Sequence, residues 1–511
     1  MRNFLSSFVL AAMPLALMAQ SAAIRIDTER AIGDIDPNIY GVFMEPIGRS
    51  TEIPVRNTLY GTLYDPQSPL ANADGFKTNY IDAARELQIS CMRWPGGNYM
   101  SGYNWQDGIG PKEQRPMRKD IAWGGYDPNT VGTDEWVKLN KAIGSENVVC
   151  LNLGLGTIND ARYWIEYTNV KGGTYYSDLR AKYGNPEPFN IKYWCLGNEL
   201  DGSPWIIGHK ELEDYCKLGL EAAKALKAVD PSVLLTANGT SYYEPTGKWI
   251  EWNRRVIETF TGVADYLSVH RYWREGSPEE RRGDYYCNVG ESAMDFEEKI
   301  TVPQGFVKAV QAVYPEKKPL MLAVDEWSGG GGNLLGVLEN AMCFNSFIRH
   351  ADFVKMANYT MFTGILATDR ASGQTYKSPL FHAFKLFSVN CRGKSLDTYV
   401  QCDKFDAGRF KDIPYLDVTS VLSADGKTVY INVVNRHKDQ AISATIENSA
   451  GEAAFTGKAV ARSIEGDVTE AFTLAKADSY VPKEKEVGVK GGKLSYTFPA
   501  HSLVQIEARV K

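Results

Sequence analysis

The stretch Lys192-Tyr193-Trp194-Cys195-Leu196-Gly197-Asn198-Glu199 joins a short apolar run to a turn and a carboxylate. Such a run, bounded by turn-forming residues, is typical of a buried strand. The pattern recurs where Pro319–Val324 leads into Asp325-Glu326-Trp327. In barrel enzymes the catalytic residues lie at the ends of the buried parallel strands and in the loops that follow them. Because cleavage of a glycosidic bond needs two carboxyl groups, these motifs predict a glycosidase.

Further apolar runs of this kind occur in series along the chain. Eight can be recognised, at 39–44, 89–94, 148–153, 193–196, 233–237, 266–270, 320–325 and 354–359. Stretches with helical spacing lie between them, for example Glu211 to Val229, which stops before Pro231. Strands that alternate with helices predict an α/β fold, a (β/α)8 TIM barrel over residues 37–392.

The pattern changes at about residue 393. Short alternating runs follow, and a tight turn is indicated at Asp425-Gly426. These features predict a C-terminal all-β sandwich domain over residues 393–511. The segment 24–36 is too short to fold independently, and we expect it to add a strand to that sandwich.

Size and charge limit the classes of function. A chain of 511 residues fits a large domain with a smaller one. The net charge of -6 provides no basic surface for nucleic acid or an anionic membrane. No metal-ligand spacing, P-loop, HExxH motif or dinucleotide fingerprint is present, so we expect no metal and no cofactor.

The first residues are typical of an export signal. Arg2 is basic, Phe4–Leu17 is an apolar stretch, and Ala19–Ala23 is rich in small residues. We therefore predict a signal peptide at residues 1–23 and an exported protein, periplasmic or extracellular. The chain has eight cysteines and no CxxC pair. Since several lie in strand-like apolar runs, we expect mostly free thiols.

Longer motifs surround the two carboxylates. They are Met92–Asn98 continued by Ser101–Pro116, Trp194–Gly202 continued by Pro204-Trp205 and Ile207–Lys210, Ser268–Tyr272, and Asp325–Trp327. From about Ile24 to the C-terminus the chain resembles glycoside hydrolase family 51, mostly α-L-arabinofuranosidases. The resemblance implies a retaining exo-enzyme that releases terminal α-L-arabinofuranosyl residues from arabinan, arabinoxylan or their oligosaccharides. It also suggests a homo-oligomer.

The resemblance assigns roles to individual residues. It implies that Glu199 is the general acid/base and Glu326 the nucleophile of a double displacement. The acid must be protonated near neutral pH, whereas a fixed cation such as Arg93 would keep the nucleophile charged. The other expected substrate-binding or orienting residues are Glu45, Arg93, Asn98, Asn198, His270, Tyr272 and Trp123.

The chain departs from the family pattern after Trp327. Ser328–Asn333 contains four glycines where the family usually has a polar-aromatic segment, and we expect a flexible loop there. Residues 274–287 look like a charged insertion. These departures keep open a β-glycan hydrolase of the same fold, an endoglucanase or a xylosidase. A non-catalytic carbohydrate-binding protein is a second alternative, against which the paired acids argue.

Overall fold

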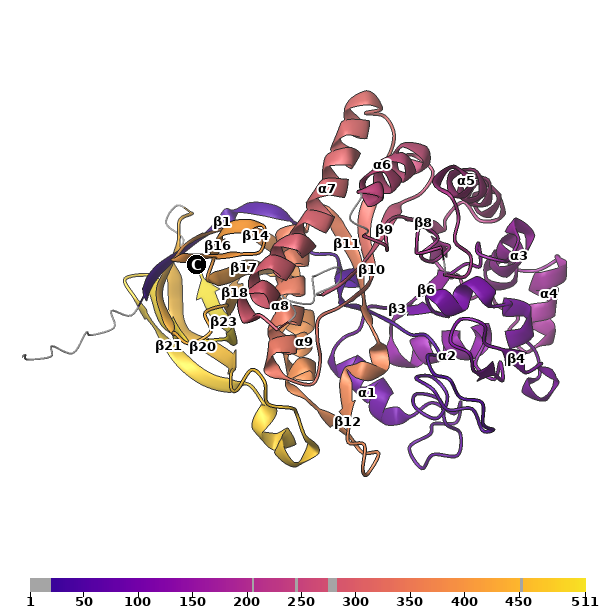
Figure 1. The fold of residues 1–511 in the computed structure, drawn as a ribbon, viewed down its shortest axis with the longest axis horizontal. Coiled ribbons are helices and arrows are strands. Elements are labelled where there is room, and N and C mark those ends of the chain that lie inside the picture. Colours follow the sequence, from indigo (N-terminus) through magenta and orange to yellow (C-terminus); the bar gives the residue numbers. More distant parts are fainter. Residues whose placement is uncertain (1–19, 205, 244–246, 274–282, 451–453) are drawn as a thin grey trace, which may run out of the picture.

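The computed structural model of the chain describes residues 20–204, 206–243, 247–273, 283–450 and 454–511. Residues 1–19, which hold most of the predicted signal peptide, lie outside the described residues. The same is true of 274–282, the larger part of the charged insertion. The other residues form two closed sheets and the helices around them (Figure 1).

Within the described residues, eight parallel strands close into a barrel in the order β10-β11-β2-β3-β6-β7-β8-β9. The predicted TIM barrel is confirmed, and each strand overlaps one of the predicted apolar runs. The strands are β2 (Gly41–Phe43), β3 (Cys91–Trp94), β6 (Glu146–Cys150), β7 (Tyr193–Leu196), β8 (Leu234–Asn238), β9 (Tyr266–Tyr272), β10 (Met321–Ser328) and β11 (Val354–Thr360).

Helices connect these strands and cover the outside of the barrel (Figure 1). They form because their apolar residues recur at helical spacing: in α5, Tyr215, Ala222 and Leu226 are buried, and the helix ends before Pro231. The helices are α1 (Thr78–Glu86), α2 (Thr133–Ile143), α3 (Ile158–Asn169), α4 (Tyr175–Lys182), α5 (Leu212–Val229), α6 (Lys248–Phe260), α7 (Ser292–Val313), α8 (Leu334–Arg349) and α9 (Pro379–Asn390).

The predicted C-terminal all-β domain is also confirmed. Its strands close around a second apolar core, in the order β1-β14-β17-β18-β23-β20-β21-β22-β19 for the part of the chain that is described. They are β1 (Gln20–Asp34), β14 (Gly393–Gln401), β17 (Leu416–Ser423), β18 (Thr428–Asn435), β19 (Ile442–Asn448), β20 (Phe455–Ile464), β21 (Lys483–Lys490), β22 (Lys493–Phe498) and β23 (Ser502–Val510). The N-terminal β1 pairs with β14 and β19.

Three short hairpins complete the strands. They are β4 (Arg118–Lys119) with β5 (Tyr126–Asp127), β12 (Leu366–Thr368) with β13 (Thr375–Lys377), and β15 (Lys404–Ala407) with β16 (Phe410–Pro414). All eight cysteines lie among the described residues and are free. No helix in the described part of the chain is long and apolar enough to cross a membrane.

A buried ion network joins the barrel to the all-β domain. Arg349, at the end of α8, forms ion pairs with Glu297 of α7 and with Asp417 of β17, the latter at 2.6 Å. Arg436, just after β18, lies 3.3 Å from the same Asp417 carboxylate. Although burial acts to raise the pKa of Glu297, the charges of Arg349 and His350 lower it from 4.5 to about 2.

We expect Glu297→Ala to lower the free energy of unfolding by about 2 kcal/mol at pH 7, because the partly buried Arg349 would keep only Asp417 as a partner. The pKa of Glu297 is depressed, so its stabilisation is present above pH 4.5 and is lost as pH falls towards 2. The difference between wild type and variant in urea denaturation should therefore shrink over that range.

Glu258→Ala is the matched control, because Glu258 pairs with Arg254 on the exposed face of α6. It should change the free energy of unfolding by less than about 1 kcal/mol. Equal losses in the two variants, or a loss in Glu297→Ala that does not depend on pH, would contradict a buried network.

Candidate active site

An irregularity in β10 places two adjacent carboxylates on one side of the strand. Residues 323 to 326 of β10 run alongside only 268 to 270 of β9, so β10 carries one extra residue. In a regular strand Asp325 and Glu326 would point to opposite faces. Here both contact the same guanidinium, that of Arg93: its Nε lies 3.1 Å from Asp325 Oδ2 and its Nη1 2.8 Å from Glu326 Oε1.

Arg93 links three strands of the barrel. It lies at 0% exposure on β3, contacts the β10 carboxylates, and donates from Nη2 to Asn198 Oδ1 at 2.7 Å. Asn198 follows β7, directly before Glu199. The guanidinium group therefore fixes the position of Glu326, the nucleophile candidate, relative to Asn198, which directly precedes the acid candidate Glu199.

His270 of β9 lies between the candidate acid and the β10 carboxylates. Its Nδ1 is 2.9 Å from Glu199 Oε1 and 3.6 Å from Glu326 Oε1, and its Nε2 is 3.4 Å from Asp325 Oδ1. One side-chain oxygen each of Glu199 and Glu326 and one ring nitrogen of His270 lie within 4.8 Å of one another. Tyr272, two residues on, donates to Glu326 Oε2 at 2.6 Å.

Glu45, two residues after β2, forms the opposite wall of the site. Its Oε1 accepts from the backbone N–H of Tyr99 at 2.8 Å and from Trp123 Nε1 at 3.0 Å. The structure thus pairs two of the predicted residues, Glu45 and Trp123. Both bonds use Oε1, so Oε2 remains for another contact.

A glycine keeps the centre of the site open. A Cβ added at Gly97 would lie 2.8 Å from Glu326 Oε1 and 3.4 Å from both Asn198 Nδ2 and Glu45 Oε2. The side-chain atoms Asn198 Nδ2 and Asn98 Oδ1 are buried without a hydrogen-bond partner among the described residues. Buried polar atoms in this state are costly unless a ligand satisfies them.

The carboxyl groups of the site differ in the direction in which their pKa values are shifted. Burial and the charge of Glu326 raise the pKa of Glu45 to about 8. Burial likewise raises the pKa of Glu199; the hydrogen bond from His270 acts to lower this pKa, and the charge of Glu326 acts to raise it. By contrast, although burial acts to raise it, Arg93 and His270 lower the pKa of Asp325 to about 2.

The surrounding carboxylates favour the charged form of His270. Burial acts to lower its pKa, but Glu326 and Asp325 raise it well above its ordinary value. Although Glu199, His270 and Glu326 have the spacing of metal ligands, a protonated imidazole offers donors and no lone pair for a metal. We therefore interpret the cluster as a hydrogen-bonded proton-transfer site.

Sequence reasoning missed two residues of this site. Asp325 was recognised only as part of its motif, yet it contacts Arg93, His270 and Ser268 Oγ. Gly97 was quoted in a motif without a role. The signal for Asp325 was present, since a second acid directly beside the nucleophile candidate at the end of a buried strand is unusual.

Gly329 and Gly330, at the start of the glycine-rich loop after β10, are held by α8. Gly330 N–H donates to Glu339 Oε2 at 2.6 Å, and Gly329 N–H donates to Asn340 Oδ1 at 3.0 Å. A Cβ at Gly329 would lie 2.8 Å from the backbone nitrogen of Asn340. The glycines therefore permit close packing on the helix.

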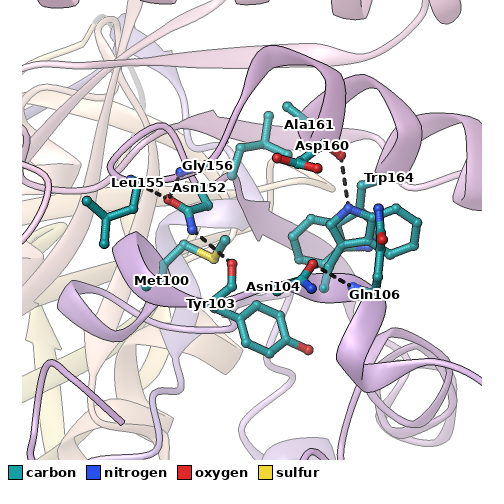
Figure 2. A pocket seen from close by; sticks show the side chains of 13 residues that line it. Met100, Tyr103, Asn104, Gln106, Asn152, Leu155, Gly156, Asp160, Ala161 and Trp164 are labelled. Carbon is teal, nitrogen blue, oxygen red and sulfur yellow. Dashed lines mark hydrogen bonds between the residues drawn. The ribbon is translucent and has the colours of Figure 1, made fainter. Parts of the chain in front are cut away.

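A cavity of about 310 Å³ lies between the loops that follow β3 and β6, and Figure 2 shows the side chains that line it. The amide of Asn152 is engaged there by its own loops: it donates to Tyr103 O and accepts from the N–H groups of Leu155 and Gly156. None of the predicted site residues lines this cavity, and we assign it no role.

Comparison with known proteins gives the family. The model of the α-L-arabinofuranosidase 1 domain matches residues 83–277, and that of the α-L-arabinofuranosidase C-terminal domain matches 331–502. The chain is 35% identical to an intracellular exo-α-(1→5)-L-arabinofuranosidase 1 of Bacillus subtilis, over 82% of this chain and 86% of that protein. It is 30% identical to the structure of the thermostable GH51 α-L-arabinofuranosidase of Thermotoga petrophila (TM-score 0.82), over 95% and 99% of the two chains.

A carboxylate pair at the mouth of a TIM barrel defines a glycoside hydrolase. With these matches, the chain belongs to glycoside hydrolase family 51, the α-L-arabinofuranosidases. Family membership does not favour the alternative of a β-glycan hydrolase or a binding protein.

The prediction of an exported protein is wrong. The Bacillus subtilis relative is named intracellular, as is an exo-α-(1→5)-L-arabinofuranosidase of Halalkalibacterium halodurans, 34% identical over 83% of this chain and 87% of that protein. The structure also argues against the predicted end of the signal peptide. Residues 20–23, predicted to form the end of the signal peptide, belong to β1 and pair with Ile442–Thr445 of β19.

We expect Gly97→Ala to lower kcat/KM on 4-nitrophenyl α-L-arabinofuranoside by about 100-fold, since the added methyl displaces substrate or the Glu326 carboxylate. Circular dichroism should show an unchanged fold. Gly305→Ala on α7 is the control, because a Cβ there meets nothing within 4 Å. Near-wild-type activity of Gly97→Ala would show that the space in front of Gly97 need not stay open.

Proposed function

We propose that the protein is a retaining exo-α-L-arabinofuranosidase that acts on arabinan- or arabinoxylan-type polysaccharides and oligosaccharides. The observation that carries the proposal is the approach of Glu199 and Glu326, whose nearest side-chain oxygens lie within 4.8 Å. Retaining glycosidases hold their carboxyl groups about 5–5.5 Å apart, and inverting enzymes about 6.5–9.5 Å. The name of the Bacillus subtilis relative makes α-1,5-linked arabino-oligosaccharides the first natural substrates to test.

In the first step, Glu326 attacks the anomeric carbon as a carboxylate. The bond from that carbon to the leaving-group oxygen breaks, and Glu199 donates its proton to this oxygen. The raised pKa of Glu199 suits an acid that must hold a proton near neutral pH. Arg93 and Tyr272 fix the two oxygens of Glu326, so that attack needs little reorganisation.

In the second step, water resolves the glycosyl-enzyme ester. Esterification removes the negative charge of Glu326, which had helped to raise the pKa of Glu199. Glu199 is now a carboxylate and takes a proton from water, whose oxygen attacks the anomeric carbon and displaces Glu326. His270, hydrogen-bonded to Glu199 at 2.9 Å, orients that carboxyl in both steps.

The space against Gly97 is where the arabinofuranosyl ring would bind. Asn198 Nδ2 and Asn98 Oδ1, both buried without partners among the described residues, would meet sugar hydroxyls there. The raised pKa of Glu45 supports a protonated carboxyl. Since Oε1 already accepts two N–H groups, the proton belongs on Oε2, which would donate to a hydroxyl.

Glu326→Ala and Glu199→Ala should each lower turnover of 4-nitrophenyl α-L-arabinofuranoside by about 1000-fold or more, because each removes a group that forms or breaks a bond. Azide should restore activity to both, with different products. In Glu326→Ala, azide replaces the nucleophile and yields the inverted glycosyl azide. In Glu199→Ala, azide attacks the covalent intermediate and yields the retained one.

Glu258→Ala, an exposed change of the same type on α6, should keep wild-type activity. The same azide stereochemistry from both variants would contradict the assigned roles. Absence of wild-type turnover would overturn the proposed activity.

The pH dependence tests the acid separately. Because Glu199 must be protonated and its pKa is raised above 4.5, kcat/KM should fall on a basic limb that lies above the usual carboxyl range. Glu199→Ala should lose this limb, because it removes the group whose titration produces it. A basic limb that persists unchanged in Glu199→Ala would assign it to another group.

A further inference from the structure

Glu199, the proposed acid, depends on a histidine for its direction. Its backbone φ is 47°, in the left-handed region that residues other than glycine rarely adopt. In the described part of the chain its side chain makes one hydrogen bond, with His270 Nδ1 at 2.9 Å. The direction of the acid therefore follows from how the His270 ring is oriented and protonated.

Asp325 of β10 lies beside the other nitrogen of that ring. His270 Nε2 is 3.4 Å from Asp325 Oδ1, and the aspartate side chain is 1% exposed. Ser268 Oγ of β9 donates to the same oxygen, and Cys195 Sγ of β7 lies 3.7 Å from Oδ2. Asp325 is thus fixed behind His270, out of reach of a substrate.

Arg93 balances the charge of Asp325 but does not direct it. Arg93 Nε lies 3.1 Å from Asp325 Oδ2, yet among the described residues this nitrogen makes no hydrogen bond. The other two nitrogens of the guanidinium donate to Glu326 and Asn198. The directed contacts of Asp325 therefore lead to His270 and the acid, and those of Arg93 lead to the nucleophile.

The His270 ring has an acid at each nitrogen. A neutral imidazole carries one N–H and can donate to only one of them, whereas the charged ring donates to both. Asp325, at Nε2, favours this second proton. The charged or titratable groups around the ring are Arg93 on β3, Glu199 and Asp201 after β7, and Asp325 and Glu326 on β10.

We propose that Asp325 is a positioning residue for the acid: it keeps His270 doubly protonated and holds the ring so that Nδ1 donates to Glu199. The inference rests on the proposed function, because it concerns the group that protonates the leaving-group oxygen. Without the charge of Asp325, Nε2 loses its proton more readily. The ring is then free to turn, and Glu199 loses its orientation.

The kinetic test compares two substrates that differ in their need for an acid. Methoxide must be protonated as it leaves, whereas 2,4-dinitrophenolate is a stable anion that needs little protonation. For Asp325→Asn we expect kcat/KM to fall about 100-fold on methyl α-L-arabinofuranoside, the lower end of what general acid catalysis contributes. On the 2,4-dinitrophenyl glycoside it should fall less than about fivefold.

Asp265→Asn is the matched control. Asp265 is also buried and ion-paired, with Lys318 at 2.7 Å and Lys227 at 3.5 Å, but it precedes β9 at the end opposite to His270. Asp265→Asn should leave the ratio of the two kcat/KM values as in wild type. A changed ratio in this control would overturn a role specific to Asp325.

Nuclear magnetic resonance of protein labelled with ¹⁵N in its six histidines measures the charge of the ring. His270, assigned from the spectrum of His270→Gln, should lose its second ring proton at lower pH in Asp325→Asn than in wild type, because a neighbouring negative charge is removed. An unchanged His270 titration would overturn the proposal. Equal losses on both substrates would also do so, since they would mean that Asp325 acts on Glu326 through Arg93.

Ser268→Ala decides the question if circular dichroism shows that Asp325→Asn has lost its fold. It removes the hydroxyl that fixes Asp325 Oδ1 and keeps the charge. We expect kcat/KM to fall about fivefold on the methyl glycoside, the scale of one lost hydrogen bond, and to stay unchanged on the 2,4-dinitrophenyl glycoside. An unchanged ratio would overturn the positioning role. Absence of wild-type turnover of both substrates would instead overturn the proposed function.

Discussion

The active site depends on one buried guanidinium. Arg93 is fully buried on β3, and it contacts Asp325, Glu326 and Asn198 from two other strands. Moving an arginine out of water is costly, and only close carboxylates and well-directed hydrogen bonds offset that cost. Because its fork is planar and always charged, the arginine also dictates where those partners can lie. The geometry of the carboxylates follows from this constraint.

Burial acts to raise the pKa of Glu45, Glu199 and Asp325 alike, and the neighbouring cations decide the outcome. Asp325 lies against both Arg93 and His270, and its pKa falls to about 2. Glu45 accepts only neutral N–H donors, and its pKa rises to about 8. A single barrel mouth can therefore hold both charged and protonated carboxyl groups.

The all-β domain supports this site at a distance. Trp327, directly after Glu326, packs edge-on against Phe344 and Phe347 of α8. The same helix lies between the barrel and the all-β domain, and its end carries Arg349, which pairs with Asp417 of β17 (Figure 1). Packing therefore connects the second domain to the strand that carries Glu326, the proposed nucleophile.

The sequence by itself determined the barrel, the all-β domain and the identity of the two carboxylates. Apolar runs, helical spacing and short motifs are local properties, and they can be recognised in the sequence without knowledge of tertiary contacts. Only the tertiary structure decided the contacts of Asp325, the need for glycine at Gly97 and the hydrogen bonds of Gly329 and Gly330 with α8. The pairing of residues 20–23 in β1 likewise could not be read from an apolar N-terminus. Each of these features depends on contacts between residues that are distant in the chain. Such contacts form only when the elements pack together, and a local sequence pattern does not reveal them.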